Sequence, residues 1–149
     1  MLSIKNTLFI FALFLMFDCK NAEQKNSQNG NIVFVSYRYT VGMGGAESIT
    51  ATKDSLISET WGRTFQDVPN FTKKIDENDW KKLINSIDLK ILENAVNGEM
   101  RGVYDGPDQI FTIKTSEKEY SFTNVRDSVS ARQLNAIKLQ LKNMVSQKK

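Results

Sequence analysis

The chain has 149 residues, a formal net charge of +3, and 40% hydrophobic and 25% charged residues. These are the values of a globular domain with one hydrophobic core. Charges of both signs are interspersed, so the sequence lacks the dense basic face that nucleic-acid binding requires. It contains no histidine and one cysteine. These counts exclude Ser-His and Cys-His catalysis, imidazole metal sites and an internal disulfide, and we expect neither a cofactor nor a metal.

The N-terminus has the pattern of an export signal. Lys5 supplies a positive charge, an uninterrupted apolar run covers residues 8–17, and Asp18 and the single cysteine, Cys19, follow at once. A membrane-spanning helix needs roughly 20 apolar residues, so this run is too short to span a bilayer. The pattern therefore predicts a signal peptide over residues 1–18.

The segment Leu-Met-Phe-Asp-Cys-Lys at residues 15–20 resembles the lipobox of bacterial lipoproteins, in particular the Lys- and Asn-rich lipoproteins of the Bacteroidetes. Asp18 stands where the family usually has a small residue. The resemblance covers about the first two dozen residues. It implies cleavage before Cys19, a diacylglycerol on the Cys19 sulfur, and anchoring to an envelope membrane, on the outer membrane or the periplasmic face. The alternative is an incidental thiol in or beside a signal that is cut elsewhere, for example after Ala22.

The rest of the chain divides into a tether and one domain. Residues 19–30 are polar and nearly free of apolar side chains, which is typical of a flexible linker. As a coil this linker would span roughly 20 Å, enough to hold a domain away from lipid headgroups. We expect a single domain over residues 31–149.

The first half of the domain predicts three strands, over residues 32–39, 47–52 and 56–61, because β-branched and aromatic residues alternate there. A glycine-rich hairpin loop at 42–45 separates the first two, and a loop follows over 62–72. One face of the first strand is expected to carry Val33, Val35, Tyr37 and Tyr39. One face of the third is expected to carry Ile57, Glu59 and Trp61.

A helix is predicted to begin after Asp76, whose carboxylate can cap the first amides. Its apolar stripe consists of Trp80, Leu83, Ile84 and Ile87, at helical spacing. A second short helix over 88–96 is expected to point Leu89, Leu92 and Val96 inward. Residues 98–107 are predicted to form a loop.

The C-terminal part predicts a hairpin, with strands over 110–114 and 120–125, and a long final helix. Ser130 and Gln133 have the spacing of a capping box, and Val129 is expected to pack on Leu134. The inward face of this helix is predicted to hold Leu134, Ile137, Leu141, Met144 and Val145. The order βββ-α(α)-ββ-α predicts an α+β fold with about five mostly antiparallel strands and the helices on one face.

Six aromatic residues could form a stacking surface for a sugar or a peptide. The best surface candidates are Trp61, Phe65 and Phe71, which flank the loop at 62–72. The alternative is that these rings pack in the core. Ser55 and Ser128 follow aspartates in Asp-Ser-aliphatic triplets, which resemble the O-glycosylation signal of exported Bacteroidetes proteins.

The acidic residues give weaker indications of a functional site than the aromatic residues do. Glu47 and Glu59 lie on neighbouring predicted strands and could face each other, as glycosidase carboxylates do. The alternative is that both are solvated acids on a face of the sheet. Asp105 and Asp108 share a turn but supply fewer oxygens than a calcium loop needs.

These features give three hypotheses for function, in decreasing order. The first is a lipid-anchored, non-enzymatic envelope domain that binds, supports or inhibits a partner protein. The second is a glycan- or peptide-binding module, and the third is a carboxylate-based hydrolase. Lipid anchorage and the lack of catalytic groups place the first ahead.

Overall fold

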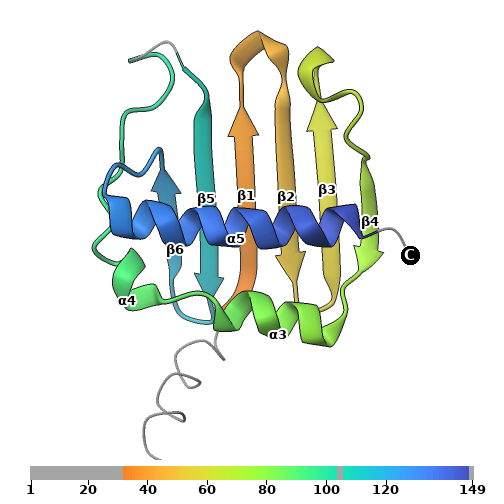
Figure 1. Cartoon of the computed structure of the whole chain (residues 1–149), viewed down its shortest axis with the longest axis vertical. Coiled ribbons are helices and arrows are strands. Elements are labelled where there is room, and N and C mark those ends of the chain that lie inside the picture. The colour runs from red at the N-terminus through yellow and green to blue at the C-terminus, as the bar shows by residue number, and fades with distance from the viewer. Residues whose placement is uncertain (1–31, 104–105, 148–149) are drawn as a thin grey trace, which may run out of the picture.

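The structure, a computed structural model, describes residues 32–103 and 106–147. Its centre is one antiparallel sheet of six strands in the order β4-β3-β2-β1-β5-β6 (Figure 1). The strands are β1 (Ile32–Thr40), β2 (Ala46–Thr52), β3 (Ser55–Trp61), β4 (Phe71–Lys74), β5 (Asp108–Thr115) and β6 (Glu119–Thr123). The α+β class and the antiparallel sheet are confirmed. The sixth strand is β4, which was not predicted; its first two residues fall at the end of the predicted loop over 62–72.

Three helices lie on one face of this sheet: α3 (Glu77–Asn85), α4 (Leu89–Leu92) and α5 (Ser128–Ser146). Figure 1 shows α5 crossing the strands almost at right angles, from β6 to β4. Asp76 caps α3, as predicted, by accepting a hydrogen bond from the Asn78 amide. The core lies between the sheet and the helices. Its fully buried side chains include Val35, Ile49, Leu56, Leu83, Ile113, Ile137 and Leu141.

Alternation along the strands sorts side chains onto two faces. Tyr37 pairs with Ile49 on one side and with Phe111 on the other, and all three point toward the helices. Val33 was predicted to share their face, but it is exposed. The register between β1 and β5 shifts between Ile32 and Phe34, and this irregularity turns Ile32 inward in place of Val33.

The second short helix is shorter than predicted. It ends at Leu92, and Val96 is exposed instead of buried. The backbone beyond the helix bonds to the start of α5: the Arg126 amide donates to the Val96 carbonyl, and the Val96 amide donates to the Asp127 carboxylate. These bonds fix the Val96 backbone at the surface.

The start of α5 also differs from the prediction. Asp127, and not Ser130, is the N-cap, because its carboxylate accepts from the Ser130 amide at 2.8 Å. The helix therefore begins earlier, and the Gln133 amide group is buried with no partner among the described residues. Val129 lies inside the helix and is exposed, so it is not the residue before the N-cap that a hydrophobic staple uses. The predicted inward residues of α5 are confirmed, with Val145 partly buried.

Candidate functional site

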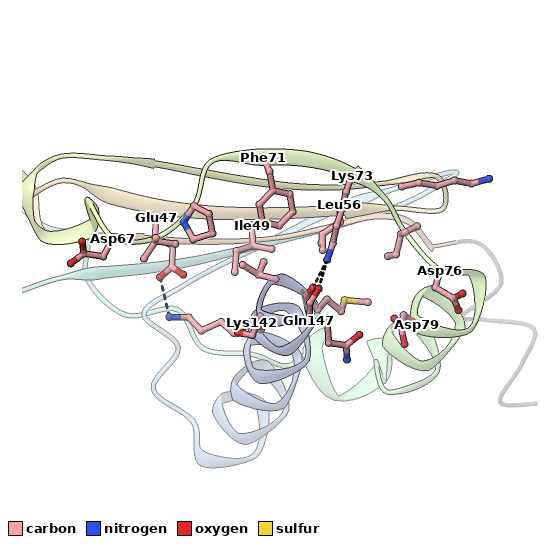
Figure 2. A pocket seen from close by; sticks show the side chains of 17 residues that line it. Glu47, Ile49, Leu56, Asp67, Phe71, Lys73, Asp76, Asp79, Lys142 and Gln147 are labelled. Atoms are coloured by element: carbon pink, nitrogen blue, oxygen red, sulfur yellow. Dashed lines mark hydrogen bonds and ion pairs between the residues drawn. The ribbon is translucent and has the colours of Figure 1, made fainter. Parts of the chain in front are cut away.

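A groove of about 920 Å³ lies between the C-terminal half of α5 and the β4 side of the sheet (Figure 2). One wall comes from the inward faces of β2, β3 and β4, and the other from the last turn of α5. The segment 67–69 and the β4–α3 connection close the sides. Its apolar lining residues are Ile49, Leu56, Val68, Pro69, Phe71, Ile75, Met144 and Val145.

An ion pair with a buried carboxylate lies at one end of the groove. Glu47 is on the inward face of β2 and is 5% exposed, and its Oε2 accepts a hydrogen bond from Lys142 Nζ at 3.0 Å. The phenol of Tyr37 lies nearby, with Lys142 Nζ 5.9 Å from the ring centre. Burial, followed by the negative charge of Glu47, raises the pKa of Tyr37 above its ordinary value. Tyr37 therefore stays protonated further into the alkaline range than an ordinary tyrosine.

A lysine closes the other end. Lys73 reaches from β4 to the end of α5, where its Nζ donates to the carbonyl oxygens of Met144 at 2.9 Å and Gln147 at 3.1 Å. Met144 lies in the last turn of α5 and Gln147 is its C-cap, where no following helical turn supplies amides to the carbonyl oxygens. A cation there also complements the helix dipole. Both ends of the groove are thus built from cations that already have partners.

The acids at the groove rim are partly engaged as well. Asp76 caps α3, and Asp79 lies 3.8 Å from Lys82 Nζ. Within the described residues, no group of three or more His, Cys, Asp or Glu side chains could hold a metal ion. The groove therefore has an apolar interior, and most of the charged side chains around it already bond to other groups of the protein.

The three aromatic residues predicted to form one surface do not lie together. Trp61 is 55% exposed on the sheet face opposite the helices. Phe65 is buried against Tyr39, edge to face, with ring centres 6.1 Å apart. Phe71 is half-buried on β4 and lines the groove. Phe71 was misplaced because β4 was not predicted. This strand turns the Phe71 side chain toward the helices.

Trp61 instead borders a shallow hollow of about 230 Å³ on the open face of the sheet. The other residues that line this hollow are Arg38, Ala46, Ser48 and Glu59. They come from three adjacent strands, β1, β2 and β3.

The two predicted strand carboxylates lie on opposite faces. Glu47 pairs with Thr60 and points toward α5, whereas Glu59 pairs with Ser48 and lies on the open face. They are separated by the sheet itself, so they do not form a carboxylate pair. The alternative, that both are solvated acids on a sheet face, is wrong for Glu47, which is buried. The inward alternation of Glu47 with Ile49 and Ala51 was the sequence signal for a buried, paired carboxylate.

The remaining predicted positions are as follows. The Ser55 hydroxyl is half-buried and lies 2.9 Å from the Thr52 hydroxyl, while Ser128 is exposed at the start of α5. The buried carboxylate of Asp108 accepts from the Arg101 amide and from the Asn124 side chain, and thereby orders the loop. Cys19, the signal peptide and the tether, like Asp105, lie outside the described residues.

No helix in the described ranges is both long and apolar enough to cross a membrane. No family model matches the chain, and no curated protein is detectably similar to it in sequence.

Proposed function

We propose that the protein is a lipid-anchored, non-enzymatic domain of the bacterial cell envelope that binds an extended apolar segment of a partner protein in the groove beside β4. Anchorage rests on the sequence, through the apolar run, Cys19 and the polar tether. Binding rests chiefly on one observation, the apolar groove of about 920 Å³.

The position of the groove favours a peptide as its occupant. β4 is an edge strand, and no other described strand pairs with its outer side. An extended peptide can add to such an edge through main-chain hydrogen bonds while every second side chain enters an adjacent pocket. Phe71 and Lys73 point inward from β4, so the edge and the groove are continuous.

The chemistry of the groove supports binding over catalysis. Glu47 and Lys142 neutralise each other, and Lys73 is held by the carbonyls that end α5. A general acid or base must be free to exchange a proton with a substrate. These side chains instead hold α5 onto the sheet.

Intact-mass analysis of the membrane fraction tests the anchor. The wild type should carry the mass of a diacylglycerol and an added acyl chain on a protein that begins at Cys19. The Cys19→Ser variant should leave the membrane fraction. A wild-type protein that is soluble and unmodified would refute anchorage.

Selection from a displayed library of random extended peptides, on the soluble Cys19→Ser chain, tests the groove. Enriched peptides should alternate apolar residues and bind at least tenfold more weakly to Val68→Glu, which places a charge at the groove wall. Val129→Glu is the matched control, because Val129 is exposed at the far end of α5. If no peptide is enriched, or if Val68→Glu binds as well as the control, the groove is not the binding site.

A further inference from the structure

The open face of the sheet has a trough along β2. The open-face residues of β2 are small: Ala46, Ser48, Thr50 and Thr52. Larger side chains flank them, Arg38 on β1 and Glu59 and Trp61 on β3. No described helix lies on this face, since all three pack on the other.

Two opposite charges face each other across this trough. Arg38 and Glu59 both pair with Ser48, one from each side. Adjacent strands are about 4.8 Å apart, so the two backbones are about 10 Å apart with only a serine between them. Neither side chain forms a hydrogen bond or an ion pair with the described residues, which leaves the guanidinium N–H groups and the carboxylate oxygens free.

Trp61 completes the site in the next row of the sheet. It pairs with Ala46, which in turn pairs with Thr40. Ala46 and Trp61 both border the hollow. Ala46 is only 3% exposed, whereas Trp61 is 55% exposed, so the indole is the accessible group of this row. The other tryptophan, Trp80, is 5% exposed in the core. An exposed indole beside free polar groups is therefore a feature of this face alone within the described chain.

We propose that this trough binds carbohydrate, with a sugar ring stacked on Trp61 and its hydroxyls bonded to Arg38 and Glu59. A pyranose ring has an apolar C–H face that suits an indole, and its hydroxyls both donate and accept hydrogen bonds. It satisfies a guanidinium and a carboxylate together without carrying charge, whereas nucleic acid would be repelled by Glu59. The hollow of about 230 Å³ is smaller than the ~300–1,000 Å³ of drug-sized sites, which suits one ring of a longer chain.

An array of defined neutral and acidic oligosaccharides, probed with the soluble Cys19→Ser chain, tests this proposal. Each hit is then titrated by calorimetry, which measures affinity in every variant, and tryptophan emission is followed in the proteins that keep Trp61. We expect binding to change the emission, Trp61→Ala to weaken binding about tenfold, and Glu59→Gln and Arg38→Gln about fivefold each. All three positions are exposed, so the variants should fold, and their melting temperatures check this.

Val68→Glu is the control that separates the two surfaces, because it alters the groove on the other side of the sheet. It should bind the same oligosaccharides as the wild type. A blank array, or hits whose affinity is the same in Trp61→Ala as in the wild type, would overturn the proposal. A ligand that requires Arg38 but neither Trp61 nor Glu59 would also overturn it, in favour of simple anion binding.

Discussion

Glu47 is a carboxylate on the inward face of a central strand, and it is stable there because Lys142 reaches it from α5. The two side chains are unequally buried: the Glu47 side chain is 6% exposed and that of Lys142 is 43% exposed. Removing the lysine would therefore leave a desolvated negative charge without a partner. Removing both charges would leave two positions that apolar groups can fill.

We predict that Lys142→Leu lowers the free energy of unfolding by about 1–3 kcal/mol, the cost of a buried charged group that loses its partner. The double variant Glu47→Leu/Lys142→Leu should recover most of this loss. Urea denaturation of the wild type, both single variants and the double variant measures the coupling. Lys138→Leu is the control, because Lys138 also approaches the Tyr37 ring but pairs with no described carboxylate. Equal losses in Lys138→Leu and Lys142→Leu would show that the ion pair is irrelevant to stability.

Asp127 connects two segments through one carboxylate. Its Oδ2 accepts from the Val96 amide at 3.0 Å, and its Oδ1 accepts from the Ser130 amide at 2.8 Å. The bond from Val96, followed by those from Ser130, lowers the pKa of Asp127 below its ordinary value of 3.8. The ionised form is thus favoured in the folded protein.

Asp127→Ala should lower the melting temperature at pH 7 more than Asp76→Ala, because the Asp76 carboxylate accepts from one amide only. The lowered pKa means that the Asp127 contribution is fully present above pH 3.8 and is lost as the pH falls through the folded-state value. The difference in melting temperature between wild type and Asp127→Ala should therefore be constant from pH 5 to 8 and shrink below about pH 4. A difference that grows on acidification would contradict this assignment.

At the scale of elements, β2 and β3 meet at a pair of glycines. Gly45 has φ +120° and Gly62 has φ +88°, and both lie where the two strands begin and end. A Cβ on Gly62 would lie 2.4 Å from the Gly45 Cα. Both positions therefore require glycine, for backbone conformation and for close approach.

Gly62→Ala should destabilise the protein by about 1–3 kcal/mol through its positive φ, with a further loss from the collision with Gly45. Gly102→Ala isolates the first effect, because Gly102 has φ +109° but no atom within 4 Å of its added Cβ. Chemical denaturation of both variants should show the larger loss for Gly62→Ala. Equal losses of stability in Gly62→Ala and Gly102→Ala would mean that β2 and β3 can move apart at this point at little cost in free energy.

The existence of the helices was predicted from sequence because their signals are local, although two of their boundaries were not. The Asp76 cap and the apolar positions Trp80, Leu83 and Ile84 lie within a few turns of one another. Ile87, the last residue of the predicted stripe, is buried but lies beyond the end of α3. The start of α5 was placed too late because two cap candidates, Asp127 and Ser130, lie three residues apart. The bond from Val96 to Asp127 decides between them, and it joins residues 31 positions apart.

The strand β4 and the groove were not predictable in this way. The residues of β4, Phe-Thr-Lys-Lys, include one apolar side chain and follow Pro69 and Asn70, so no alternation identifies a strand. Pairing with β3 alone makes them extended. The groove depends in turn on α5 lying over β4, which no local pattern encodes. Trp61 was predictable as a surface residue, because it lies two residues from the charged Glu59 and so shares one face of the strand with it.

At the scale of the whole molecule, α5 holds the sheet together. It crosses from β6 to β4 (Figure 1), and its inward residues join one continuous core with side chains of the sheet, α3 and α4. Ile137 is fully buried in the middle of this helix, while Leu139 is 51% exposed. A single core of this kind predicts that the described domain unfolds as one unit.

We therefore predict that Ile137→Ala lowers the free energy of unfolding by about 2–5 kcal/mol, through lost burial and the cavity left behind. Leu139→Ala, the matched control on the same helix, should change it by about 0.5 kcal/mol or less. The two tryptophans report on different parts of the molecule: Trp80 is buried in α3 and Trp61 is exposed on β3. The Ile137→Ala change is made in two backgrounds, Trp80→Phe, where only Trp61 reports, and Trp61→Phe, where only Trp80 reports. Denaturation of each protein should show one transition. Both transitions should move to lower denaturant concentration, with the same loss of unfolding free energy. If Ile137→Ala shifted only the transition seen by Trp80, the helices would be unfolding apart from the sheet, and α5 would not be the element that unites the domain.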